Sequence, residues 1–206
     1  MIAMPRAGLP VPAGAGIVPP MDFPLHNWAT APGDAGPVLE QVGKDLGYVP
    51  AILAQMAESP PVLEAYRSLS AIFRKSDLSP LEQHIVLLTV SAENVSHYCT
   101  PAHALRARDA SLDEVSIEAI RRGNPLTDAR QEALRTLTVQ MVRKHGRVTD
   151  SDLEAFVTAG FSRANILEII LAVGLKTLSN YVAFVAQTPL DPPMAADAFA
   201  AGRPCA

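Results

Sequence analysis

The side chains best suited to chemistry are concentrated in one stretch of the chain, residues 79–103. This stretch holds one of the two cysteines and three of the five histidines, together with two glutamates: Cys99, His84, His97, His103, Glu82 and Glu93. Cys99 and His103 are four residues apart, so on a helix they lie on one face. A thiol beside a histidine is a nucleophile beside a base, which is the arrangement that cysteine-dependent catalysis requires.

Two helices are predicted to carry these residues. Ser79 can cap a helix that has Pro80 at its first position and runs from about residue 81 to 94. Its run 85–90, IVLLTV, is apolar on more than one face, which indicates a buried central helix. Ser96 or Cys99 can cap a second helix, so Cys99 is expected at a helix N-terminus, where the dipole favours thiolate over thiol. The alternative is a buried structural cysteine.

These residues resemble the core of the carboxymuconolactone decarboxylase and alkylhydroperoxidase AhpD-like family. The resemblance rests on Leu78-Ser79-Pro80, the apolar run 85–90, Ser91-Ala92, Asn94, Tyr98-Cys99 and His103. It extends from about Val38 to Leu190, which is most of the chain. It implies an all-α fold with an AhpD-like helical domain.

Peroxidases of that family typically carry a Glu, eleven residues, a Cys, two residues, a Cys, three residues and a His. On this chain the pattern falls on His84, Ser96, Cys99 and His103, and the last two match. The resemblance implies that Cys99 attacks peroxide and that His103 belongs to its proton relay. His84 takes the place of the relay glutamate, and Ser96 that of the thiol that resolves the oxidised cysteine. A serine cannot form that disulfide.

Four hypotheses for the function follow. A thiol peroxidase would oxidise Cys99 to a sulfenic acid and would need Cys205, a thiol of a partner subunit or an external thiol reductant to restore it. A cofactor-free lyase acting on a lactone or small organic acid, as the decarboxylase branch implies, would use His84 or His103 as acid or base. A zinc site of His84, Cys99 and His103 is the third hypothesis. A degenerate homologue without activity is the fourth.

Other polar residues of the stretch are secondary site candidates: Glu82, Glu93, His97 and Tyr98. No organic cofactor is predicted, and the expected small-molecule partner is a peroxide or a small organic acid.

Composition restricts the class of protein further. The 206 residues are 49% hydrophobic and 18% charged, with a net charge of -4 and no run of Lys or Arg that would track phosphates, so nucleic acid is not expected as a partner. Two cysteines are too few for a disulfide framework. No signal peptide and no membrane span are predicted, which favours a cytoplasmic protein without a membrane partner.

Three regions are expected. Residues 1–37, rich in Pro, Ala and Gly, form an N-terminal arm; residues 38–190 form the helical domain; and residues 191–206 form a flexible tail. Helices are predicted after a capping box at Ser111 and after a cap at Thr127. Further helices are expected from Thr149 to Ala159 and from Ser162 onward.

The last long helix, about 162–186, is apolar nearly all round and is expected to pack on the helix of residues 81–94. The similarity of residues 162–181 to 79–98 is compatible with an internal helical-hairpin duplication. A homo-oligomer is expected, because the long helices are more apolar than a monomer needs.

Overall fold

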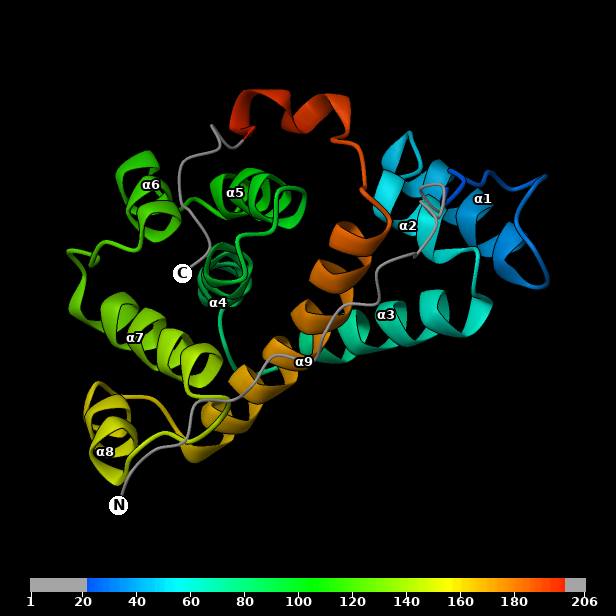
Figure 1. Ribbon diagram of the computed structural model, residues 1–206. Helices are drawn as coiled ribbons and strands as arrows, with labels where there is room; N and C mark the ends of the chain where they lie inside the picture. Colours follow the sequence, from blue (N-terminus) through cyan, green and yellow to red (C-terminus); the bar gives the residue numbers. More distant parts are fainter. Residues whose placement is uncertain (1–21, 199–206) are drawn as a thin grey trace, which may run out of the picture.

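A buried helix, α4 (Pro80–Glu93), occupies the centre of the molecule, and other helices surround it (Figure 1). The computed structural model describes residues 22–198, and in this part of the chain it contains helices and no strands. Besides α4, the elements in chain order are α1 (Ala35–Leu46), α2 (Ala51–Met56), α3 (Pro60–Phe73), α5 (Cys99–Asp109), α6 (Glu114–Arg122), α7 (Ala129–Arg143), α8 (Asp150–Thr158), α9 (Arg163–Val185) and the 3-10 helix η1 (Pro192–Asp197). The all-α prediction is confirmed.

The central position of α4 follows from its sequence. All eight residues from Ile85 to Ala92 are buried, and α5, α6, α7 and α9 pack around them. The predicted cap is present as a capping box, because Ser79 Oγ accepts from the Glu82 N–H while the Glu82 carboxylate accepts from the Ser79 N–H. A helix that is apolar on every face is stable only when neighbours cover it on every side.

The buried apolar residues form two clusters, and the start of α5 lies where they meet. The larger cluster surrounds α4 and includes residues of α6, α7 and α9. The smaller one joins α1 and α2 to Tyr98, Cys99 and Ala183. Helix α9 contributes to both, with Ile169, Ala172 and Leu175 in the first and Ala183 in the second.

The buried face of α9 is polar between these two apolar segments. Lys176, Ser179 and Asn180 are each buried there, spaced three and four residues apart so that they share one side of the helix. The fold therefore places a short polar segment between two hydrophobic clusters.

The other face of α9 is exposed. Its exposed apolar side chains are Leu167, Ile170, Tyr181, Phe184 and Val185. By length and composition α9 could cross a membrane, a test that core helices of soluble proteins also pass, and 39% of its most apolar window is buried inside the protein. Homo-oligomer formation stays a prediction.

The described part of the N-terminal arm, residues 22–34, packs against α2. The His26 N–H donates to the Ala54 carbonyl, and Gln55 Nε2 donates to the Phe23 carbonyl. Gly36 allows a close approach, since a Cβ there would lie 2.6 Å from the Trp28 carbonyl oxygen. Helix α1 begins three residues earlier than the predicted start of the helical domain at Val38. The rest of the arm lies outside the described residues.

Helix caps show where local prediction succeeded. Helices begin at Thr149 and Ser162 as expected, and in the structure these two residues cap α8 and α9 in capping boxes. Two other caps were wrong by one or two residues: Asp113 rather than Ser111 caps α6, and Asp128 rather than Thr127 caps α7. In both cases a carboxylate accepts the backbone N–H three residues ahead.

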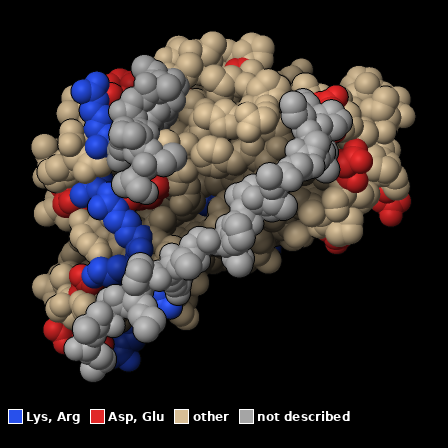
Figure 2. Space-filling view, in the orientation of Figure 1, with Lys and Arg blue, Asp and Glu red and all other residues tan. Residues whose placement is uncertain are grey.

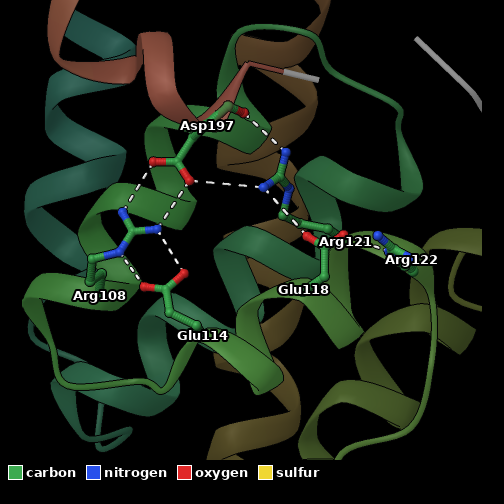
Figure 3. Close-up of polar contacts among 6 residues, drawn as sticks. All are labelled: Arg108, Glu114, Glu118, Arg121, Arg122 and Asp197. Atoms are coloured by element: carbon green, nitrogen blue, oxygen red, sulfur yellow. Dashed lines mark hydrogen bonds and ion pairs between the residues drawn. The ribbon is translucent and has the colours of Figure 1, made fainter. Parts of the chain in front are cut away.

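The tail expected from residue 191 begins as a fixed segment. The buried Asp191 accepts from the Ala51 N–H at 3.0 Å and from the Tyr98 hydroxyl at 2.5 Å. At the end of η1, the side chain of Asp197 is bound by two arginines, Arg108 of α5 and Arg121 of α6 (Figure 3). These contacts correct the prediction of a flexible tail for residues 191–198. Residues 199–206, with Cys205, lie outside the described residues.

On one face of the molecule most of the visible basic side chains lie over α6, α7 and α8 with acidic groups among them, and further acidic groups lie on the opposite side (Figure 2). Ion pairs account for this pattern, among them Arg122–Glu118, Arg143–Glu93 and Lys144–Asp152. Opposite charges that neutralise each other in this way do not form a basic patch.

The Asp197 contacts predict a stability difference between two neighbouring carboxylates. Asp197→Ala should lower the free energy of unfolding by about 2 kcal/mol, because it removes a buried carboxylate that two guanidinium groups bind. Glu114→Ala removes a carboxylate that also binds Arg108, but from an exposed position, and should cost less. Urea denaturation measures both, and equal losses would contradict this account of the C-terminal segment.

Candidate functional site

Cys99 is the first residue of α5, and its side chain is buried. A turn connects the end of α4 to Cys99, and Val95 in this turn lies in the left-handed region at φ 52°. The Cys99 N–H donates to the Ser96 hydroxyl at 3.2 Å, so Ser96 satisfies an N–H that the helix start leaves open. Cys99 thus lies at the positive end of the α5 dipole.

The thiol faces the polar segment of α9. Cys99 Sγ lies 3.8 Å from Ser179 Oγ. Lys176 Nζ lies 3.0 Å from the same hydroxyl oxygen and donates to it. Ser179 therefore connects a buried thiol to a buried amine.

Lys176 is 1% exposed, which is rare for a lysine. Burial lowers the pKa of its amine, while the charge and a hydrogen bond of Cys99 act in the opposite direction and raise it. Burial is the larger effect, so the pKa of this amine lies below its usual value.

His103 lies one turn after Cys99 on α5, and its ring centroid lies 6.3 Å from that of His84 on α4. The pKa of His103 lies well below its usual range. Burial is the largest cause, followed by the charges of Lys176, His84 and Arg106. Burial and then the charge of Arg106 also lower the pKa of His84, whereas the charge of Asp109 raises it by a smaller amount. Both pKa shifts favour the neutral form of the imidazole. Among the described residues, no hydrogen bond joins His103 to Cys99.

Several buried polar atoms around these helices have no hydrogen-bond partner among the described residues. They are Nδ1 of His84 and of His103, both amide atoms of Asn180, and the hydroxyls of Thr100 and Thr89. Asn180 shares the buried face of α9 with Lys176, and Thr100 follows Cys99 directly. Tyr66 of α3 also lies close enough for Cys99 to affect it, because burial and then the Cys99 charge raise the pKa of Tyr66 to about 12.

The secondary candidates have partners that account for them structurally. His97 Nε2 lies 3.0 Å from the Thr188 carbonyl, and its ring meets Phe184 edge-on. Tyr98 donates to Asp191. Glu82 completes the α4 capping box and pairs with Arg130, while Glu93 pairs with Arg143.

The zinc hypothesis does not gain support from the geometry. Within residues 22–198, no group of three or more His, Cys, Asp or Glu side chains is arranged to hold a metal ion. The set His84, Cys99 and His103 therefore does not form a coordination site in this structure.

Sequence reasoning missed Lys176, Ser179, Asn180 and Tyr66. One signal pointed to Lys176: it is a lysine inside a helix read as apolar nearly all round. A charge in such a segment requires either an exposed stripe or a buried partner. The partner, Cys99, lies 77 residues earlier in the chain, so local patterns did not show it.

Comparison with known proteins agrees with the fold. No protein-family model matches the chain, and no curated protein matches it. The chain is similar to the structure of an uncharacterized peroxidase-related protein from Ralstonia eutropha JMP134, described as an alkylhydroperoxidase AhpD core, with 21% identity, 85% of this chain and 95% of that chain covered, and a TM-score of 0.76. A peroxidase-related protein from Silicibacter sp. TM1040 shows 26% identity, coverages of 85% and 93%, and a TM-score of 0.73.

A third structure is the debrominase Bmp8 in complex with 2,3,4-tribromopyrrole, with 14% identity, coverages of 82% and 90%, and a TM-score of 0.66. The chain thus has the AhpD-like all-helical fold of peroxidase-related proteins, as the resemblance implied. The internal duplication stays a prediction.

The lowered histidine pKa values predict a loss of stability in mild acid. Below about pH 6.5 the unfolded chain protonates His84 and His103, whereas the folded protein does not, so the unfolded state binds more protons. The free energy of unfolding should therefore decrease as the pH is lowered, by up to about 1.4 kcal/mol per pH unit for each histidine. Urea denaturation between pH 7 and pH 5 measures this slope.

Substitution identifies the groups responsible for the slope. It should be shallower in His103→Gln, and shallower still when His84→Gln is added. A slope that both substitutions leave unchanged would show that neither imidazole is neutral through burial.

Proposed function

We propose that this protein is a cysteine-dependent, peroxidase-related oxidoreductase in which Cys99 reduces a peroxide. The observation that carries the proposal is the position of the thiol: it begins a helix, and a buried hydroxyl and a buried amine lie next to it. Both features favour the thiolate, which is the form of cysteine that attacks peroxides. The similarity to peroxidase-related proteins supports the same class of chemistry.

In the proposed reaction, the Cys99 thiolate attacks one peroxide oxygen. A sulfur–oxygen bond forms and the oxygen–oxygen bond breaks, so that the bonding electron pair leaves with an alkoxide or hydroxide, which takes up a proton. Cys99 ends as a sulfenic acid. His103, one turn after Cys99 on the same helix, is the member of the proton relay that the sequence resemblance implies.

Reduction of the Cys99 sulfenic acid back to the thiol requires a reductant. Ser96 cannot supply a second thiol, and its hydroxyl instead binds the Cys99 backbone N–H. We propose that an external dithiol reduces the sulfenic acid, releasing water and becoming a disulfide.

The rate of Cys99 oxidation tests the proposal. In a Cys205→Ser background, hydrogen peroxide or an organic hydroperoxide should oxidise Cys99 roughly tenfold faster or more than a free thiol at neutral pH, because the thiolate fraction sets the rate. Stopped-flow kinetics measure the rate, and mass spectrometry of the trapped sulfenic acid locates it. A rate equal to that of free thiol would contradict the proposal.

A matched substrate panel separates the alternatives. Turnover of a peroxide with a dithiol should vanish in Cys99→Ser, whereas a lactone or small acid processed by histidine chemistry would survive that substitution. A brominated pyrrole belongs in the panel because a structure similar to this chain is that of a debrominase. Thiol-dependent turnover of the pyrrole with none of any peroxide would assign the site to dehalogenation instead.

Ser96→Cys is expected to change the oxidised product. It places a second thiol three residues before Cys99, so peroxide should yield a disulfide with the loss of two hydrogens rather than a persistent sulfenic acid. Intact-mass spectrometry distinguishes these products. Ser116→Cys, which puts a thiol at a buried position on α6, is the control and should keep the sulfenic acid.

A further inference from the structure

The charge of Lys176 has an unusual environment. Its amine is buried, and the hydrogen bond that fixes it goes to the neutral hydroxyl of Ser179. Among the described residues no carboxylate forms an ion pair with it. An ammonium group buried without a counter-charge carries a large free-energy cost, so it either loses its proton or acquires an anion.

The sulfur of Cys99 is the atom that can supply this anion. It lies 3.8 Å from the hydroxyl that Lys176 binds, and it begins a helix whose dipole favours negative charge. A thiolate facing an ammonium has the same net charge as a thiol facing an amine. One proton can therefore move between the two side chains while the net charge of the buried site is unchanged.

We propose that Lys176 and Cys99 share one proton as a buried ammonium–thiolate pair, and that Lys176 is the acid that protonates the oxygen leaving the peroxide. The pairing stands on the geometry alone, and the acid role rests on the proposed peroxidase function. Ser179 positions the two groups.

The step balances with the groups present and the peroxide. The thiolate attacks one oxygen, the other leaves with the electron pair of the broken bond, and the ammonium gives that oxygen its proton. The products are the sulfenic acid, an alcohol or water, and a neutral lysine amine. An external dithiol then reduces the sulfenic acid, and the proton returns to the pair with the regenerated thiol.

The titratable groups around the pair do not replace Lys176 in this role. His103 of α5 and His84 of α4 are neutral, since burial lowers the pKa of each, and so hold no proton to donate as cations. Tyr66 of α3 keeps its proton because burial raises its pKa to about 12. The Tyr98 hydroxyl is committed to Asp191. Arg106 adds a fixed positive charge and does not give up a proton.

Thiol alkylation tests the pairing without any peroxide. In the Cys205→Ser background, the rate of Cys99 alkylation by iodoacetamide is followed against pH in the wild type and in Lys176→Met. Loss of the ammonium should move the midpoint of the profile to higher pH and slow alkylation near neutral pH by about tenfold for each unit of displacement. Lys44→Met, which removes an exposed lysine, is the matched control and should leave the profile unchanged.

Ser179→Ala is a second variant that preserves the lysine. It should shift the profile in the same direction by a smaller amount, because it removes the hydroxyl between the two groups. It also keeps the test decisive if Lys176→Met does not fold. If Lys176→Met folds and its alkylation profile is unchanged, the pairing is overturned. If Lys176→Met does not fold, an unchanged profile in Ser179→Ala overturns it.

Lys176→Arg separates the counter-charge from the acid. A guanidinium retains the positive charge but does not release its proton. The alkylation profile should therefore stay near that of the wild type, while oxidation of Cys99 by hydrogen peroxide slows at least roughly tenfold, within the range that general acid catalysis supplies. Oxidation as fast as in the wild type would overturn the acid role.

Failure of the proposed function gives a different pattern. If Cys99 of the wild type reacts with peroxides no faster than free thiol, yet Lys176→Met shifts the alkylation profile, the pairing is supported and the peroxidase function, with the acid role, is overturned.

Discussion

The site depends on the placement of three polar residues inside an apolar interior. Lys176, Ser179 and Asn180 lie on the buried face of α9, between the segments that pack into two hydrophobic clusters. Because those clusters fix both ends of the face, the polar groups between them cannot turn toward water. Lys176 and Ser179 therefore have their partners inside the protein, and the start of α5 provides one in Cys99. The packing of the core thus also determines which polar groups the thiol faces.

Departure from the family motif has a physical explanation in this arrangement. The Ser96 hydroxyl accepts the N–H of Cys99 and stabilises the helix start, which a thiol in its place would do less well. His84, at the position of the relay glutamate, lies beside His103 and carries no negative charge. Under the proposed peroxidase function, a site without that carboxylate needs another group to manage the proton, and Lys176 is an ionisable group that a hydroxyl links to the thiol. Ser96 and Ser179, which the hypothesis of an internal duplication aligns, both contact Cys99.

Features set by neighbouring residues were predictable from the sequence. The buried α4, its capping box at Ser79 and the position of Cys99 at a helix start all follow from patterns within a few residues. The fixed C-terminal segment was not predictable, because Asp191 and Asp197 bind Tyr98 and Arg108 about ninety residues away. His97 and Tyr98 looked like site residues for the same reason: their partners, Thr188 and Asp191, are distant in sequence. Lys176 became interpretable only when the fold showed what it faces.

The protonation state of Lys176 is the most direct test of this account. Nitrogen-15 NMR of the lysine side chains, with the Lys176 signal identified by its absence in Lys176→Met, reports whether its nitrogen is an ammonium or an amine. The account predicts an ammonium at neutral pH while Cys99 is reduced, and a neutral amine after Cys99 is blocked by alkylation. A neutral amine in the reduced protein, or an ammonium that blocking Cys99 does not change, would contradict the pairing on which the site is built.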